Sequence, residues 1–147
     1  MEFQIQPSPT RTSHLGHSDV PGYAEGLWTP SLGGNTTYVT QYGLFVKIGR
    51  LVWISALMHV SAIGTGSTTT ITGLPFPAYN HPNGLGATVN ATAGGSATAI
   101  VAVWGQIQSG GSSIILNSRV AASTGSAANA IFANDTAVSI TGVYRVE

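Results

Sequence analysis

Few side chains of this sequence could do chemistry, and those few are far apart. His14, His17 and Asp19 have a spacing that could place two imidazoles and a carboxylate around a metal ion. A metal site needs further ligands that are held rigidly, whereas these residues lie in a segment that contains glycine and proline. We therefore expect solvated or partner-facing histidines, with no metal and no cofactor.

The sequence offers equally few candidate residues for acid–base catalysis. No Asp, Glu, Lys or Arg occurs from Leu51 through Ser118, so His59 and His81 are the groups there that titrate near neutral pH. Glycoside hydrolysis usually needs two carboxyl groups facing one bond, and the five acids of the chain form no such pair on an expected strand face. The sequence has no cysteine and no G-x-S-x-G motif. We expect no catalytic residues and a protein that is not an enzyme.

The composition points to an assembly. Charged residues make up 7% of the 147 residues, against about 25% in ordinary soluble domains. The five basic and five acidic residues cancel, which disfavours nucleic acid and anionic membranes as partners. No apolar run approaches the roughly 20 residues that span a bilayer. Because a net charge near zero promotes association, we expect this one-domain chain to work as part of a larger structure.

The elements that must position any site fall into two parts. Residues 1–26 contain Pro7, Pro9 and Pro21, which break helices. Such a segment reads as an extended arm that could add to a sheet edge or lie in a groove of another subunit; a solvated chain end is the alternative. The arm's candidate docking residues are its spaced large apolar side chains, Phe3, Ile5, Leu15, Val20 and Tyr23.

Residues 27–147 are rich in Thr, Ser, Gly, Val, Ile and Ala and show no helical periodicity of useful length. Segments 43–48 and 51–60 predict a hairpin whose Gly49-Arg50 turn suits type II′. Several short strands separated by glycine clusters are typical of an all-β fold, an antiparallel β-sandwich or jelly roll. The further strands expected are 68–72, 85–92, 97–107, 113–117, 130–133 and 138–146.

Three segments carry a resemblance to a known family: EGLWTPSL at 25–32, YVTQYGLFVKIGRLV at 38–52, and GTG at 64–66 leading to ITGLPF at 71–76. Together they resemble the C-terminal β-domains of tail fibres and tailspikes of tailed phages, over roughly residues 26–147. Phe45-Val46 and Arg50 depart from the family pattern, which often has Tyr followed by a polar residue and Asn or Asp in the turn.

The resemblance implies a homotrimeric β-sandwich on the surface of a virion. Tailspike catalytic residues lie in a β-helix that this chain lacks, so none are carried over. The second strand of the hairpin is apolar on both faces, which is typical of a strand covered by another chain. We expect the trimer interface at Leu51, Trp53 and Leu57 and at the last strand around Tyr144.

Because a short arm runs directly into the domain, with no shaft between them, the sequence favours a capsid decoration (cement) protein. In this interpretation the arm binds the major capsid protein and stabilises the shell from the capsid exterior. The alternative is a receptor-binding tip of a short tail fibre, tailspike or head fibre that contacts a host-surface glycan, through exposed loops such as 79–86.

Overall fold

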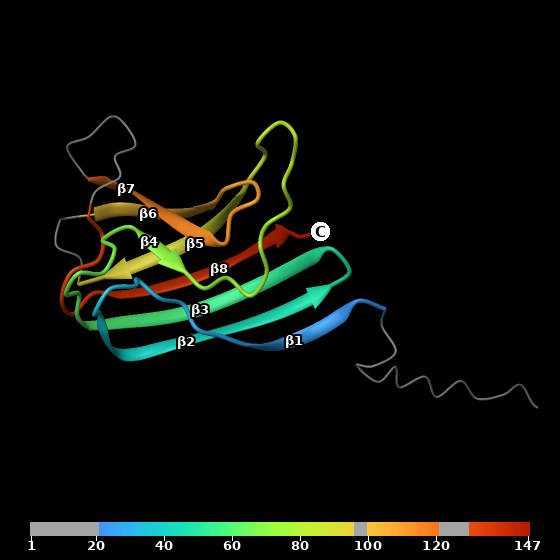
Figure 1. Cartoon of the computed structure of the whole chain (residues 1–147). Helices are drawn as coiled ribbons and strands as arrows, with labels where there is room; N and C mark the ends of the chain where they lie inside the picture. The colour runs from blue at the N-terminus through green and yellow to red at the C-terminus, as the bar shows by residue number, and fades with distance from the viewer. Residues whose placement is uncertain (1–20, 96–99, 121–129) are drawn as a thin grey trace, which may run out of the picture.

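The computed structural model describes residues 21–95, 100–120 and 130–147, and the regular structure in these ranges is all β-strand. The strands form one antiparallel sheet in the order β1-β2-β3-β8-β5-β6-β7-β4 (Figure 1). The expected all-β antiparallel fold is confirmed, and its strands lie in a single curled sheet. Their bounds are β1 (Tyr23–Trp28), β2 (Thr37–Ile48), β3 (Leu51–Ala62), β4 (Thr70–Thr72), β5 (Ala87–Gly94), β6 (Ile100–Ile107), β7 (Ser113–Val120) and β8 (Ala137–Arg145).

The β2–β3 hairpin is the longest local unit of the fold. Ile48 pairs with Leu51, and Gly49 between them has φ 58°, the positive φ that a type II′ turn needs at its first central position. Each strand runs for 12 residues. The predicted hairpin and its turn are therefore confirmed.

The sheet curls because glycines line part of its inner face. Val89 of β5 packs over Gly142 of β8 and Gly105 of β6, the strands on either side of it. A Cβ on Gly105 would come 2.5 Å from Val89 Cγ2, and a Cβ on Gly142 would collide with the same side chain. Missing side chains on neighbouring strands let the inner face bend sharply around one valine.

The curl brings the two ends of the sheet order together. Ser31, just after β1, forms an isolated antiparallel bridge with Thr72 of β4. Its N–H donates to the Thr72 carbonyl at 3.1 Å, and the Thr72 N–H donates back at 2.7 Å. The two halves of the sheet thus enclose one core.

The core is filled by alternate residues of the strands and by the loops that cover the open ends. Along β3 the even-numbered side chains from Val52 to Val60 are buried, as the predicted alternation requires. The other large buried side chains include Ile71, Ile107, Ile114, Leu116, Ile131, Phe132, Ile140 and Tyr144.

Two expectations about the elements were wrong. Residues 130–133 form no strand: the N–H groups of Ile131 and Phe132 both donate to the carbonyl of Thr68, at 2.9 and 3.0 Å, which fixes a loop that drops both side chains into the core. The arm boundary at residue 26 falls inside β1, which pairs with β2 from Tyr23 onward. Part of the expected strand 97–107 lies outside the described residues.

Candidate interaction surface

The outer side of β3 is the first unusual surface. Leu51, Trp53 and Leu57 point away from the core and are 56%, 38% and 46% exposed. Strand alternation puts them there, because the buried residues of β3 occupy every second position. All three predicted β3 interface residues are therefore on the surface of the single chain and open to a partner.

Neighbouring strands extend this surface in register. Trp53 pairs with Val46 of β2 on one side and with Val143 of β8 on the other. Residues that pair across antiparallel strands share a face of the sheet, so their side chains line up in rows. The resulting outer apolar face consists of Leu27, Tyr42, Leu44, Val46, Ile48, Leu51, Trp53, Leu57 and Val143.

A hollow of about 500 Å³ lies within this face. Its walls come from β1, β2 and β3, and among the residues that line it only Glu25 carries a charge. Strands β1, β2, β3 and β8 form the outer apolar face. Besides Glu25, their register places one other charged residue, Arg145, on the outer side. The lining residues are Glu25, Gly26, Leu44, Phe45, Val46 and Trp53.

The expectation for Tyr144 was wrong. Tyr144 pairs with Val52, faces the core and is 2% exposed. Its hydroxyl donates a hydrogen bond to the carbonyl oxygen of Phe76 at 2.9 Å. Burial raises the pKa of this phenol to about 12. The outward residue of the last strand is its neighbour, Val143.

Of the candidate arm residues, the structure describes only Tyr23. Phe3, Ile5, Leu15 and Val20 lie outside the described residues, as do His14, His17 and Asp19. Tyr23 lies in β1, and its hydroxyl donates to Glu25 Oε2 at 2.5 Å. This hydrogen bond to a carboxylate is the main cause that raises the pKa of Tyr23.

A second notable surface lies at the end of the sheet that holds the β2–β3 turn. The guanidinium of Arg145 lies 4.3 Å from the ring centroid of Tyr79, and that of Arg50 lies 6.0 Å from it. Lys47 Nζ is 5.9 Å from the ring centroid of Phe76. Both distances to Tyr79 are within the range of cation–π attraction. The loop 79–86 was expected to be exposed, but its cationic neighbours were not foreseen.

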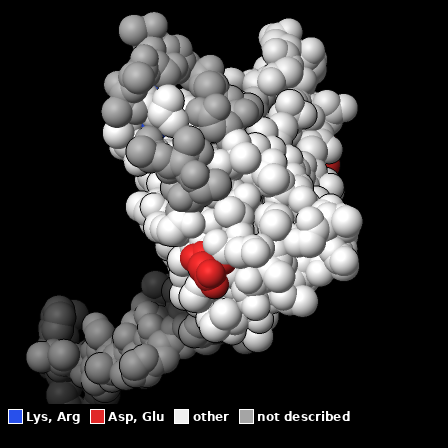
Figure 2. Space-filling model, turned by 90° about the vertical axis from the view of Figure 1, so that its left-hand side faces the viewer, with Lys and Arg blue, Asp and Glu red and all other residues white. Residues whose placement is uncertain are grey.

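The remaining surface carries little charge. Figure 2, which views the end of the molecule away from the C-terminus, shows an almost uncharged surface with little more than one small acidic spot. Within the described ranges no three His, Cys, Asp or Glu residues lie close enough to hold a metal ion. No helix in those ranges is long and apolar enough to cross a membrane.

Comparison with protein families, with curated proteins and with solved structures found no match.

Proposed function

We propose that this protein is a structural subunit whose copies associate, as a homotrimer, through the outer apolar face. The observation that carries the proposal is the row Val46, Trp53 and Val143, in which a half-exposed indole is flanked by apolar side chains on both neighbouring strands. Monomeric soluble proteins rarely expose large contiguous apolar patches. Interfaces between permanent partners are large and apolar, and this face has that character.

The low charge of the chain supports the same proposal. A monomer normally relies on charged residues for solubility, and only 7% of the residues of this chain are charged. If the outer apolar face is covered by other copies, the assembly needs fewer charges per chain. Sequence composition and surface chemistry are then explained by one property, the burial of a second face of the sheet.

We place this assembly on the surface of a tailed-phage virion, as a decoration protein of the capsid exterior. Support comes from the resemblance to tail-fibre and tailspike β-domains, whose first two segments, 25–32 and 38–52, cover most of β1 and β2, the turn and the start of β3. The strands that carry the resemblance also carry much of the outer apolar face. In this proposal residues 1–20, with Phe3, Ile5, Leu15 and Val20, bind the major capsid protein.

Counting labelled copies on purified virions tests this placement. Hundreds of copies spread over the shell, lost on deletion of residues 1–20 while host adsorption survives, are the expected result. A handful of copies at one vertex or on the tail, with adsorption lost when loop 79–86 is changed, would overturn it in favour of a receptor-binding tip.

A further inference from the structure

Strand β5 changes its partner halfway along its length. Residues 87–90 pair with β6, whereas residues 90–94 pair with β8. The β5–β6 ladder therefore ends at Asn90 and Trp104, although β5 continues to Gly94 and β6 begins at Ile100. The two stretches beyond this ladder, 91–94 and 100–103, form a fork in the sheet. Because a strand directs alternate N–H and C=O groups to each side, both facing edges of the fork can pair with a further strand.

A hollow of about 330 Å³ lies in this fork. Consecutive residues of both strands line it, 91–93 of β5 and 100–103 of β6. Since successive residues of a strand point to opposite faces, the hollow lies between the two strands and not over one face of them. None of the lining residues is charged, and three of them are alanines. The fork therefore suits an uncharged, largely apolar segment.

The other end of β5 shows how this chain fills such a gap. There β5 has left β8, and the loop that precedes β5 lies beside β8 instead: the Tyr79 N–H donates to the Arg145 carbonyl at 2.8 Å. The hollow that remains at that end is about 90 Å³. At the fork, apart from the ladders with β8 and β7, no segment of the described chain makes a backbone hydrogen bond to either stretch.

The first six residues of the chain have the pattern of a strand that fits this fork. Residues 1–6, MEFQIQ, alternate apolar and polar side chains, and Pro7 ends the run. In an inserted strand the apolar side chains Phe3 and Ile5 point to the core side. There the neighbouring side chains of β5 are Ala91 and Ala93, which pack against the core and are small.

The charges on the outer side are complementary as well. Arg119 of β7 pairs with Ala102 of β6 and is exposed. Residues that pair across strands share a face, so Arg119 lies on the same side of the sheet as the outward positions of the fork. The polar face of an inserted MEFQIQ strand carries Glu2, the one charged residue of the six. Opposite charges thus meet on that side.

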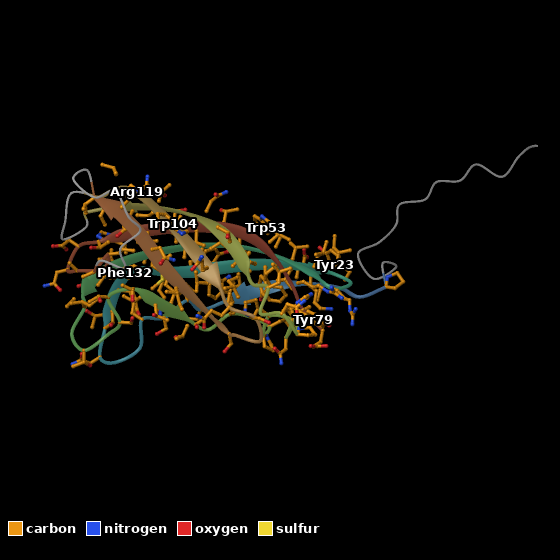
Figure 3. All side chains as sticks on the ribbon, turned by 90° about the horizontal axis from the view of Figure 1, so that it is seen from above. Tyr23, Trp53, Tyr79, Trp104, Arg119 and Phe132 are labelled. Carbon is orange, nitrogen blue, oxygen red and sulfur yellow. The ribbon has the colours of Figure 1, made fainter. Side chains whose placement is uncertain are left out.

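The chain is long enough to reach the fork. Figure 3 shows Arg119 at the end of the sheet opposite Tyr23, where the described chain enters β1. Thr92 pairs with Ser139 and Ser139 with Leu57, which puts the fork about 20 Å along the strands from the β2–β3 turn and about 19 Å across the sheet from β1. Residues 7–20, extended at about 3.3 Å each, span about 46 Å.

We propose that the fork between β5 and β6 holds residues 1–6 of this chain as an inserted strand. Backbone pairing with both edges supplies the binding, as in other cases of strand addition, and Phe3 and Ile5 supply the specificity. The proposed function assigns these two side chains to the capsid protein, so the fork holds them in the free protein and competes with the capsid for one segment. The fork itself does not depend on self-association, because no residue of the outer apolar face lines it.

Hydrogen exchange of the full chain, followed by mass spectrometry, tests this proposal. We expect the amides of residues 3–6 and of the fork to exchange roughly tenfold or more slowly in the wild type than in the variant Phe3→Ser, Ile5→Ser. Leu15→Ser, outside the six residues, is the matched control and is expected to exchange as the wild type does. Unchanged exchange in β2 and β3 shows that each variant is folded.

A synthetic peptide gives a second measurement. Added to the variant Phe3→Ser, Ile5→Ser, the peptide MEFQIQ is expected to restore the slow exchange of the fork. The peptide EMFIQQ has the same composition without the alternation, and we expect it to leave the exchange of the fork fast.

Three results would overturn the proposal. They are exchange of residues 3–6 as fast as in the free peptide, equal exchange of the fork in the wild type and in Phe3→Ser, Ile5→Ser, and restoration by EMFIQQ as complete as by MEFQIQ. Sedimentation of the same samples separates these outcomes from self-association. An intact trimer whose fork exchanges independently of Phe3 and Ile5 removes this inference alone.

Discussion

The indole of Trp28 lies directly over Gly43, its partner across β1 and β2. A Cβ at Gly43 would come within 2.5 Å of the indole Nε1, which donates a hydrogen bond to the Leu44 carbonyl at 3.1 Å. Gly43, in the segment 38–52 that resembles tail-fibre domains, thus leaves room for Trp28 of the similar segment 25–32. This contact ties the β1 edge to the hairpin.

Gly43→Ala is expected to destabilise the protein by about 1–3 kcal/mol, because the added methyl displaces a buried ring. Urea denaturation at a fixed protein concentration measures the effect. Gly94→Ala is the control, since a Cβ there meets nothing within 4 Å. Equal stability of the two variants would show that the indole does not need the space above Gly43.

Gly142→Ala is expected to destabilise the fold through its collision with Val89. Here the neighbour can be trimmed, so the double variant Gly142→Ala, Val89→Ala should recover part of the lost free energy of unfolding. A double-mutant cycle measures this coupling, expected at about 0.5–3 kcal/mol. Simple additivity of the two changes would contradict the packing of Val89 against the β8 glycine.

Tyr144→Phe removes a buried hydroxyl and leaves the Phe76 carbonyl without that donor, which is expected to cost about 1 kcal/mol. The folded-state pKa of Tyr144, about 12, lies above the ordinary tyrosine value of 10.0. The protonated phenol therefore stabilises the fold below pH 10, and this contribution is lost as the pH rises toward 12. Denaturation across that pH window should show a steeper loss for the wild type than for Tyr144→Phe. Parallel pH profiles would contradict the burial of this phenol.

Asp135 has a φ of 63°, the left-handed conformation that costs most residues about 1–2 kcal/mol. Its N–H donates to the Val60 carbonyl at 2.9 Å, which holds the turn before β8 against β3. Asp135→Ala is expected to lower the free energy of unfolding by about 1 kcal/mol, while Asp135→Gly should lower it less or raise it. Thermal unfolding of the two variants gives the comparison. A glycine variant less stable than the alanine variant would show that the positive φ at position 135 does not determine the stability.

Local alternation was enough to predict the β2–β3 hairpin and the two faces of β3. The same alternation could have placed Tyr144 correctly, since it shares its parity in β8 with the buried Val138 and Ile140. Strand β1 was missed because Glu25 and Gly26 interrupt its apolar pattern. The fit of Trp28 on Gly43 depends on which strands are neighbours, and a single sequence does not specify that.

The two candidate surfaces also differ in how far the sequence alone could predict them. Leu51, Trp53 and Leu57 could be assigned to a second face because strand alternation is local. The Tyr79 end could not be assembled from the sequence, since Arg50 comes from a hairpin turn and Arg145 from the last strand. Only the pairing of β3 with β8 brings these two arginines to one aromatic ring.

Self-association through the outer apolar face is tested most directly by the mass of the full chain in sedimentation equilibrium, compared with that of the variant Trp53→Ser, Leu57→Ser. We predict a wild-type species of three times 15.1 kDa and a shift of the double variant toward the monomer, with circular dichroism unchanged. Val101→Ser, which removes an exposed apolar side chain of β6 away from the outer apolar face, should assemble as the wild type does. A monomeric wild type, or a double variant that assembles as the wild type does, would show that the outer apolar face does not hold the copies together.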